Sequence, residues 1–448
     1  RAVCIDENGN SSPVVSASYF VDFHTKDGYD GMNILSVVTD PDNLFHRDRG
    51  IYILGSTYEA YAALEESRWY DPYWWWWDAN YTQRGRMWER PAFLQFFDAD
   101  RQLILSKTCG MRIQGGGSRG YLPRSFNFYS RKEYDGDNRL KASLFDNRYE
   151  PQRVTLFAGG DDHVVKLNDY LMASLIPDRD FSVMKFEPYV LFLNGEYWGC
   201  YWLTEKYDEE YFEYYYDVRD DNVVMIKNSA VSLGTEEDMA LYDQLRSFVI
   251  NSDLSLDENY ETACELMDMD SFIDYYAAEI YISRTNDWPA SNFALWRTRE
   301  VENGVYSDGR WRWILFDVNS GGMTSSQAED DTLSRTMSVD PFFTSLMKNH
   351  RFYEKFVSTI LDMAHKEFSP QRTDELINEF QALMRDPLLK EYSRFYGSGQ
   401  NLSAVFDRQT EDVRTFFHNR YSYITRSFSS VLKSSPEELQ TERSSFIP

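Results

Sequence analysis

The sequence GMRIQGGGSRGYLPRSFNFYSR, residues 110–131, places a glycine-rich turn between two segments that alternate apolar and polar residues as strands do. Gly115, Gly117 and Gly120 match the spacing GxGxxG, which a helix follows in a dinucleotide-binding fold. Here the turn leads into a second strand, so the pattern does not support that fold. Two interpretations remain: a plain tight turn, or a glycine-rich loop that covers phosphates, as in protein kinases.

Composition limits the classes of protein that fit. Hydrophobic residues make up 42% of the 448 residues and aromatic residues 17%, which excludes a disordered chain and suits two or three domains or one enlarged domain. The net charge of -26 argues against nucleic acid as a partner, because phosphate binding needs a basic face. This negative charge favours a metal ion or a cationic partner. The alternative is that the charge only keeps the chain soluble. No apolar run approaches the roughly 18 residues of a membrane span.

Four cysteines are widely separated and form no CxxC pair, so we expect neither a zinc site nor a dense disulfide framework. Short strands are predicted at 13–23, 33–45 and 50–55. Asp40 and Asp42, with Asp48 nearby, would either hold Ca²⁺ or form a plain turn, since the spacing lacks a full calcium loop. In the aromatic segment 66–90, we expect some of the four successive tryptophans to meet a partner or a sugar, or to cover a neighbouring helix.

The rest of the chain alternates strands and helices before it becomes mainly helical. An Asn194-Gly195 pair predicts a tight hairpin. Helices are predicted at 163–176, 208–217, 268–283, 341–368, 372–395 and 404–431, and strands at 223–228, 293–299 and 310–317. This order predicts an α+β protein with a β-rich N-terminal part and a helical C-terminal part.

Two polar positions follow the predicted helix at 268–283. Asp287 and Asn292, in NDWPASN, have the D-x-x-x-x-N spacing of a kinase catalytic loop, although chance also produces such pairs. Asp317 ends the apolar strand in WRWILFDVNSGG, where a carboxylate must be solvated, paired or metal-bound. The alternatives are a buried turn for the first pair and a turn cap for Asp317.

Taken together, these segments resemble the spore-coat-protein CotH family of atypical protein kinases. The resemblance covers roughly residues 30 to 430 and includes SVVTDPDNLF, the glycine-rich segment, FLNGEYWGCYWLTEKYD, NDWPASN and WRWILFDVNSGG. It implies a reduced protein-kinase-like fold. Residues 1–85 would be a lead-in, 86–430 a CotH-type domain with lobes at 86–205 and 206–430, and 431–448 a polar tail.

The resemblance also implies a function: ATP-dependent transfer of phosphate to Ser or Thr of a secreted or cell-surface protein, with Mg²⁺ or Mn²⁺. The acidic charge adds the expectation of a basic substrate segment. The implied roles are the base for Asp287, metal binding for Asn292, Asp317 and Asn319, and nucleotide contacts for Gly115, Gly117, Ser118, Arg124, Asp169 and Glu205. Asp169 would pair with the phosphate-binding cation, and Glu205 would lie near the adenine or ribose.

Two departures from the family pattern give an alternative. Arg124 stands where the family commonly has Lys, and Asn319 stands where it commonly has a second Asp. An Arg fork is not interchangeable with an ammonium, and an amide removes one ligand charge. The alternative is a catalytically weak or inactive kinase-like surface or adhesion module that binds a protein partner or a glycan.

Overall fold

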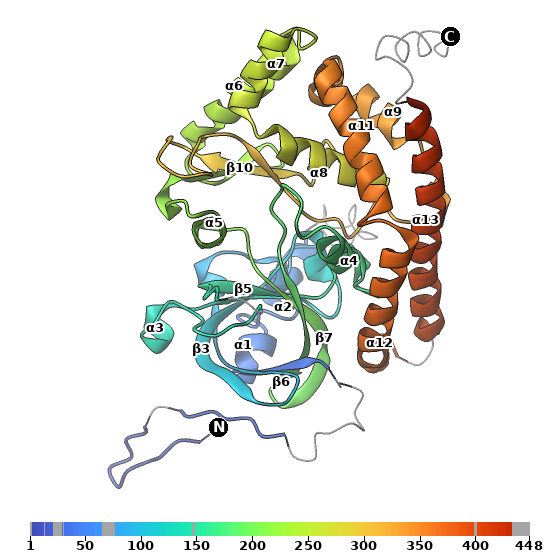
Figure 1. Cartoon of the computed structure of the whole chain (residues 1–448). Helices are drawn as coiled ribbons and strands as arrows, with labels where there is room; N and C mark the ends of the chain where they lie inside the picture. Colours follow the sequence, from blue (N-terminus) through green and yellow to red (C-terminus); the bar gives the residue numbers. More distant parts are fainter. Residues whose placement is uncertain are drawn as a thin grey trace. The chain divides into compact units, whose positions relative to one another are not determined.

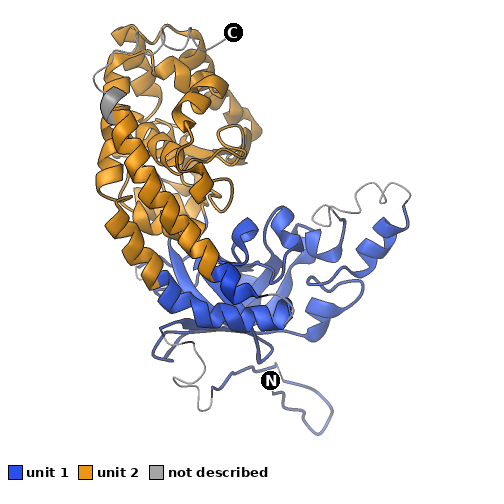
Figure 2. Ribbon diagram, turned by 90° about the vertical axis from the view of Figure 1, so that its right-hand side faces the viewer, with its two compact units in different colours: residues 1–166, 185–206, 380–406 blue, residues 167–184, 207–379, 407–448 orange. Residues whose placement is uncertain are grey.

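The computed structural model describes residues 2–12, 14–20, 29, 31–64, 77–145, 148–397 and 401–431. The chain divides into two compact units, each assembled from separated stretches (Figure 2). Unit 1 comprises residues 1–166, 185–206 and 380–406, and unit 2 comprises residues 167–184, 207–379 and 407–448. The predictions for Trp74, Trp75 and Trp76 and for the tail from 432 onward lie outside the described residues.

Unit 1 is built on a closed seven-stranded barrel (Figure 1). Its strands are β1 (Asn33–Val38), β2 (Arg90–Phe97), β3 (Leu103–Ile113), β4 (Phe126–Tyr129), β5 (Arg153–Phe157), β6 (Phe186–Leu193) and β7 (Glu196–Thr204). Neighbours pair antiparallel in the order β1-β2-β3-β4-β5-β7-β6, and a parallel pairing of β6 with β1 closes the barrel. The β6–β7 hairpin turns at Asn194 and Gly195, with φ angles of 53° and 87°, which confirms the predicted turn.

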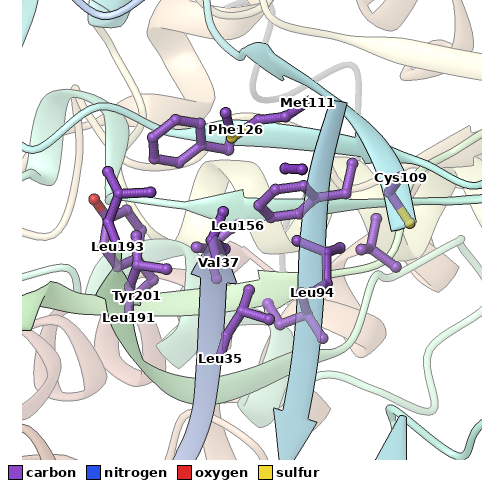
Figure 3. Close-up of a cluster of buried hydrophobic side chains, with 14 of the residues drawn as sticks. Leu35, Val37, Leu94, Cys109, Met111, Phe126, Leu156, Leu191, Leu193 and Tyr201 are labelled. Carbon is purple, nitrogen blue, oxygen red and sulfur yellow. The ribbon is translucent and has the colours of Figure 1, made fainter. Parts of the chain in front are cut away.

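The barrel interior is filled by alternate residues of each strand (Figure 3). Met111 of β3, Phe126 of β4, Val37 of β1 and Leu94 of β2 all belong to this buried cluster. Since successive side chains of a strand point to opposite faces, the residues between these positions lie on the outer face. Arg112 and Asn127 are therefore outer residues of β3 and β4, at paired positions.

Short helices accompany the barrel: α1 (Pro41–Phe45), α2 (Gly55–Ala62) and α3 (Lys132–Asp135). The strand expected at 50–55 is wrong, because the backbone N–H groups of Ile51 and Tyr52 donate to the α1 carbonyls of Asn43 and Leu44 instead of to a ladder. These residues still reach the barrel core.

The acidic residues near α1 have partners of their own. Asp40 caps the helix by accepting from the Asp42 backbone N–H at 3.0 Å. Asp42 pairs with Arg49 at 2.6 Å, and Asp48 pairs with Arg47 at 2.9 Å. These contacts agree with the turn interpretation, and calcium binding stays a prediction.

Unit 2 combines an open sheet with helices. The sheet order is β11 (Arg312–Ile314), β10 (Ala294–Thr298), β8 (Val223–Lys227) and β9 (Ala230–Leu233), all antiparallel. The helices that lie wholly in this unit are α4 (Asn168–Leu175), α5 (Glu209–Tyr216), α6 (Met239–Asn251), α7 (Asp257–Leu266), α8 (Met269–Tyr281), α9 (Thr332–Val339), α10 (Pro341–Leu346) and α11 (His350–His365). Residues of α12 (Pro370–Phe395) and α13 (Leu402–Val431) belong to both units.

Two features of this arrangement bear on the site. Helix α4 begins at Asn168, five residues after the start predicted at 163, because a 3₁₀ turn at Gly160–Asp162 and a left-handed Lys166 (φ 64°) precede it. Helix α8 is buried along nearly its whole length and ends just before the NDWPASN segment. The predicted mixed α and β architecture, with a β-rich N-terminal part and a helical C-terminal part, is confirmed.

Candidate functional site

The loop after α8 holds the predicted base. Asp287 is 28% exposed, and its Oδ2 accepts a short hydrogen bond from the Asn292 amide. Its Oδ1 is buried and has no hydrogen-bond partner among the described residues. Asn292 has a positive φ of 53°, a conformation that Asn tolerates better than most residues. One oxygen of Asp287 is therefore held by a hydrogen bond, and the other is left without one.

A buried guanidinium connects this loop to the second acidic segment. Arg284 is fully buried and donates to Glu279 Oε1 at 3.1 Å, to the Phe316 carbonyl at 3.2 Å and to the Asp317 carbonyl. Its Nη2 lies 3.7 Å from Asp287 Oδ1. Arg284 thus fixes the base candidate and the backbone of Asp317 with one rigid group.

Glycines let the two segments run backbone to backbone. Thr285 N–H donates to the Gly321 carbonyl at 2.9 Å, and Met323 N–H donates to the Ile282 carbonyl at 3.0 Å. A Cβ on Gly321 would lie 2.5 Å from the Asn286 side chain, and one on Gly322 would lie 2.6 Å from the Ile282 carbonyl oxygen. The Gly-Gly pair that ends WRWILFDVNSGG is therefore required for this close approach.

Three of the predicted site residues, Asp169, Asp317 and Asn319, lie close together near this Gly-Gly pair. The Asn319 amide donates to Asp317 Oδ1 at 2.6 Å and to Asp169 Oδ2 at 3.0 Å, and the Val318 N–H donates to Asp169 Oδ1 at 2.9 Å. Asp317 has a left-handed φ of 58°, and such conformations in non-glycine residues gather at functional sites. Asp169 therefore has an amide and a second carboxylate as neighbours, and its pairing with the phosphate-binding cation stays a prediction.

The charge of Asp317 disfavours the ionised form of Asp169. Burial and the nearby charge of Asp317 together raise the pKa of Asp169 to about 7, although the hydrogen bonds from Asn319 and Val318 act in the opposite direction. A divalent cation between the carboxylates would relieve this repulsion, and oxygen donors of this type suit Mg²⁺. The described chain gathers no group of three or more His, Cys, Asp or Glu side chains for a metal. Amide oxygens and the substrate's own oxygens would have to complete such a site.

In unit 1 the glycine-rich segment forms a tight turn, Gly117–Gly120, between β3 and β4. Gly115 has a φ of 120°, and a Cβ there would lie 2.5 Å from Ser118 Oγ. The Gly115 carbonyl accepts from Arg119 Nε at 2.7 Å and from Arg84 at 3.2 Å. The turn is therefore compact and flanked by two cations.

The two remaining nucleotide candidates are buried in unit 1. Arg124 donates to the carbonyls of Tyr52, at 3.1 Å, and Arg119, and its guanidinium lies 3.7 Å from the Tyr81 ring centre. Burial lowers its pKa, and these contacts use its Nε and Nη1. The contact of Arg124 with phosphate stays a prediction. Glu205 is 1% exposed and accepts from the Lys185 N–H at 2.9 Å. Its contact with adenine or ribose stays a prediction.

Sequence reasoning missed Glu279 and Arg284. Glu279 is the single charged residue in YYAAEIYIS, and a charge within an apolar helix must find a partner. Arg284 follows five residues later and is that partner. The isolated acidic residue was a usable signal for a buried ion pair.

Comparison with known proteins gives one family match. The sequence profile of the family described as CotH kinase protein matches residues 111–424, which is more than two thirds of the chain. No curated protein gives a match. Among the described residues, none of the helices has both the length and the apolarity needed to span a bilayer. The matched range includes every residue of the site described above, from Asp169 to Met323, and the chain belongs to the CotH kinase protein family.

Proposed function

We propose that this chain is an ATP-dependent protein kinase that transfers phosphate to Ser or Thr hydroxyl groups of a secreted or surface protein. The observation that carries the proposal is the arrangement around Arg284. One buried guanidinium, Arg284, lies beside the Asp287 carboxylate and holds the backbone carbonyl of Asp317. Asp317 in turn shares the Asn319 amide with Asp169. The kinase-like fold implied by the family belongs to the same proposal.

In this proposal the Asp287 carboxylate accepts the proton of the substrate hydroxyl as the hydroxyl oxygen bonds to the γ-phosphorus, while the bond from that phosphorus to the departing ADP oxygen breaks. Asn292 donates to one oxygen of this carboxylate and Arg284 lies beside the other, so the orientation of the carboxylate is fixed. Asp169 and Asp317 would hold Mg²⁺ or Mn²⁺, with Asn319 and Asn292 as amide candidates. Such an ion neutralises charge on the phosphates.

The proposal separates the base from the metal ligands, and two substitutions test this separation. Asp287→Asn should preserve the affinity for Mg-ATP and lower turnover by about a hundred- to ten-thousand-fold, the usual contribution of a positioned base. Asp317→Asn should lower both, because it removes a carboxylate charge from the metal site. The assay is phosphate transfer to a Ser-rich basic peptide, alongside calorimetric titration with Mg-ATP.

The parent chain and a Glu261→Gln variant serve as controls, because Glu261 is 66% exposed and belongs to a surface pair with Arg351. If Asp287→Asn turns over at the parental rate, the base assignment is wrong. If the parent binds no nucleotide at millimolar ATP with Mg²⁺ or Mn²⁺, the non-catalytic surface module is the better description.

A further inference from the structure

A guanidinium on α9 binds the backbone of the loop that carries Asp287. Arg335 donates to the Trp288 carbonyl at 3.2 Å and makes a shorter hydrogen bond to the Thr285 carbonyl. These two carbonyls stand on either side of Asp287 in the sequence, within residues 285–291, which we call the base loop. One planar group of unit 2 therefore joins the chain before the base candidate to the chain after it.

The base loop makes few backbone hydrogen bonds of its own near the base candidate. Within it, the Ser291 N–H donates to the Asp287 carbonyl at 2.9 Å. The carbonyls of Thr285 and Trp288 accept from no described residue other than Arg335. Because backbone carbonyls that are withdrawn from water are normally paired, the course of the base loop depends on this guanidinium.

Arg335 differs from Arg284 in the kind of partner it has. Arg284 forms an ion pair with the buried Glu279, whereas no carboxylate of a described residue lies within ion-pair distance of Arg335. Its two hydrogen bonds to described residues both go to base-loop carbonyls. A planar fork holds two acceptors at a fixed spacing, which a single ammonium does not. These contacts indicate that Arg335 sets the geometry of the loop and does not neutralise a charge.

The helix that carries Arg335 is itself fixed to the end of α8. The buried Arg420 of α13 donates to the carbonyls of Ile280 and Tyr281, both at 2.7 Å, where α8 ends. The same guanidinium donates to the Asp330 carbonyl at 2.7 Å and to Thr332 Oγ1 at 3.2 Å, where α9 begins. The base loop and α9 therefore start from one anchored point, so α9 is a fixed support from which the loop is held.

We propose that Arg335 is a positioning residue for phosphate transfer, which sets the backbone of the base loop and through it the place of the Asp287 carboxylate. The inference rests on the proposed kinase function. Arg284 and Asn292 fix this carboxylate from the side-chain end, and Arg335 fixes the same residue from its main chain. In this role Arg335 acts through Asp287 and contacts no reacting atom.

The first test separates turnover from nucleotide binding. Arg335→Ala should lower turnover with a Ser-rich basic peptide about ten- to a hundredfold, because small displacements of a catalytic group are costly. The dissociation constant for Mg-ATP, from calorimetry, should stay within about threefold of the parental value, since the variant leaves the metal-ligand candidates intact. Arg335→Lys should lose about three- to tenfold in turnover, because its ammonium holds one carbonyl and not both.

Arg90→Ala is the matched control. Arg90 also donates to two backbone carbonyls, those of Met87 at 2.8 Å and Arg49 at 2.9 Å, but these belong to unit 1 and not to the base loop. Its turnover should equal that of the parent. Thermal midpoints of all variants show whether each one is folded at the assay temperature.

A double substitution tests whether Arg335 acts through the base. In an Asp287→Asn background, Arg335→Ala should lower turnover by less than about threefold further, because there is no base left to place. A merely structural role would multiply the two losses. Full multiplication, or a loss of Mg-ATP affinity and thermal midpoint in step with turnover in both Arg335 variants, would overturn the assignment.

The outcomes also separate this inference from the kinase proposal. If the parent transfers phosphate and Arg335→Ala does so at the same rate, only the positioning role is wrong. If the parent transfers no phosphate, both proposals fall.

Discussion

Each unit contains a fully buried ion pair, and the two pairs differ in how completely they are satisfied. In unit 1, Lys166 Nζ donates to both oxygens of Glu391, at 2.7 and 2.8 Å, and to the Cys200 carbonyl at 2.7 Å, which uses all three of its donors. In unit 2, Arg284 pairs with Glu279, but its Nε and the neighbouring Asp287 Oδ1 have no hydrogen-bond partners among the described residues.

The difference shows that burial and charge alone do not identify a functional group. A pair whose donors and acceptors are all matched has no capacity left for a ligand, and its role is to hold segments together. A pair that keeps buried atoms without partners carries a cost in stability, and sites that bind or react tend to carry such costs. The unit 2 pair touches both acidic segments of the candidate site, whereas the unit 1 pair bonds to the Cys200 backbone and lies beside the Tyr201 ring.

The largest effect should come from breaking the matched pair. Lys166→Met leaves the Glu391 carboxylate buried without its cation, and the free energy of unfolding should fall by about 3–5 kcal/mol. Adding Glu391→Gln removes the uncompensated charge and should recover much of the loss. Urea unfolding of both variants measures this. A single substitution that costs less than about 1 kcal/mol would show that the pair is not important for stability.

Arg284→Lys tests the unmatched pair through activity. The ammonium keeps the charge but cannot hold Glu279, Asp287 and the Asp317 carbonyl in one plane. Turnover should fall about a hundredfold, as small misplacements of catalytic groups do, while the affinity for Mg-ATP changes little. Phosphate transfer and calorimetry on the same preparation give both quantities. If Arg284→Lys turns over at the parental rate, the role of Arg284 is only structural, like that of Lys166.

A third ion pair, Asp238 with Arg299, is partly exposed, and its contribution to stability should depend on pH. Hydrogen bonds from Arg299, against the cost of burial, lower the pKa of Asp238 to about 2, below the roughly 3.9 of an unfolded Asp. Its contribution is therefore present above pH 4 and is lost as the pH falls toward 2, by about 1–2 kcal/mol. Urea midpoints between pH 5 and pH 2.5 should show this slope, and Asp238→Asn should reduce it. An unchanged slope in the variant would assign it to other carboxylates.

The smallest effect is expected at an exposed pair. Arg351 and Glu261 lie 3.2 Å apart with side chains 48% and 66% exposed. Glu261→Ala should change the free energy of unfolding by less than about 0.5 kcal/mol, because water and salt screen such pairs. A loss above 1 kcal/mol at 0.15 M salt would mean that exposure is a poor guide to the value of an ion pair in this chain.

Local signals in the sequence were sufficient for much of the fold. The Asn194-Gly195 turn and the long helices follow from adjacent residues and regular periodicity, and the structure confirms them. The prediction of a strand at 50–55 was wrong. The side chains of Ile51 and Tyr52 are apolar because they pack in the barrel core, but their backbone N–H groups donate to carbonyls of α1 and not to a neighbouring strand. Apolarity reports burial, and it does not report which backbone groups pair.

For the candidate site, too, the sequence predicted contacts between residues that are close along the chain and not contacts between distant ones. Asp287 and Asn292 lie five residues apart in one loop, so their spacing in the sequence predicted their contact. Asp169 and Asn319 are 150 residues apart, and only the fold places their side chains 3.0 Å from each other.

The closed barrel has a consequence for how the chain behaves at high concentration. Each of the seven strands of the unit 1 barrel pairs with a neighbour on both sides. The barrel therefore has no edge strand whose backbone N–H and C=O groups could pair with a strand of another chain. The sheet of unit 2 is open at β9, which is four residues long and is followed by a left-handed Gly234 (φ 103°). An edge strand this short can form few hydrogen bonds with a strand of another molecule. The barrel strands, which are rich in aromatic and β-branched residues, are protected from amyloid-like stacking as long as the barrel remains closed.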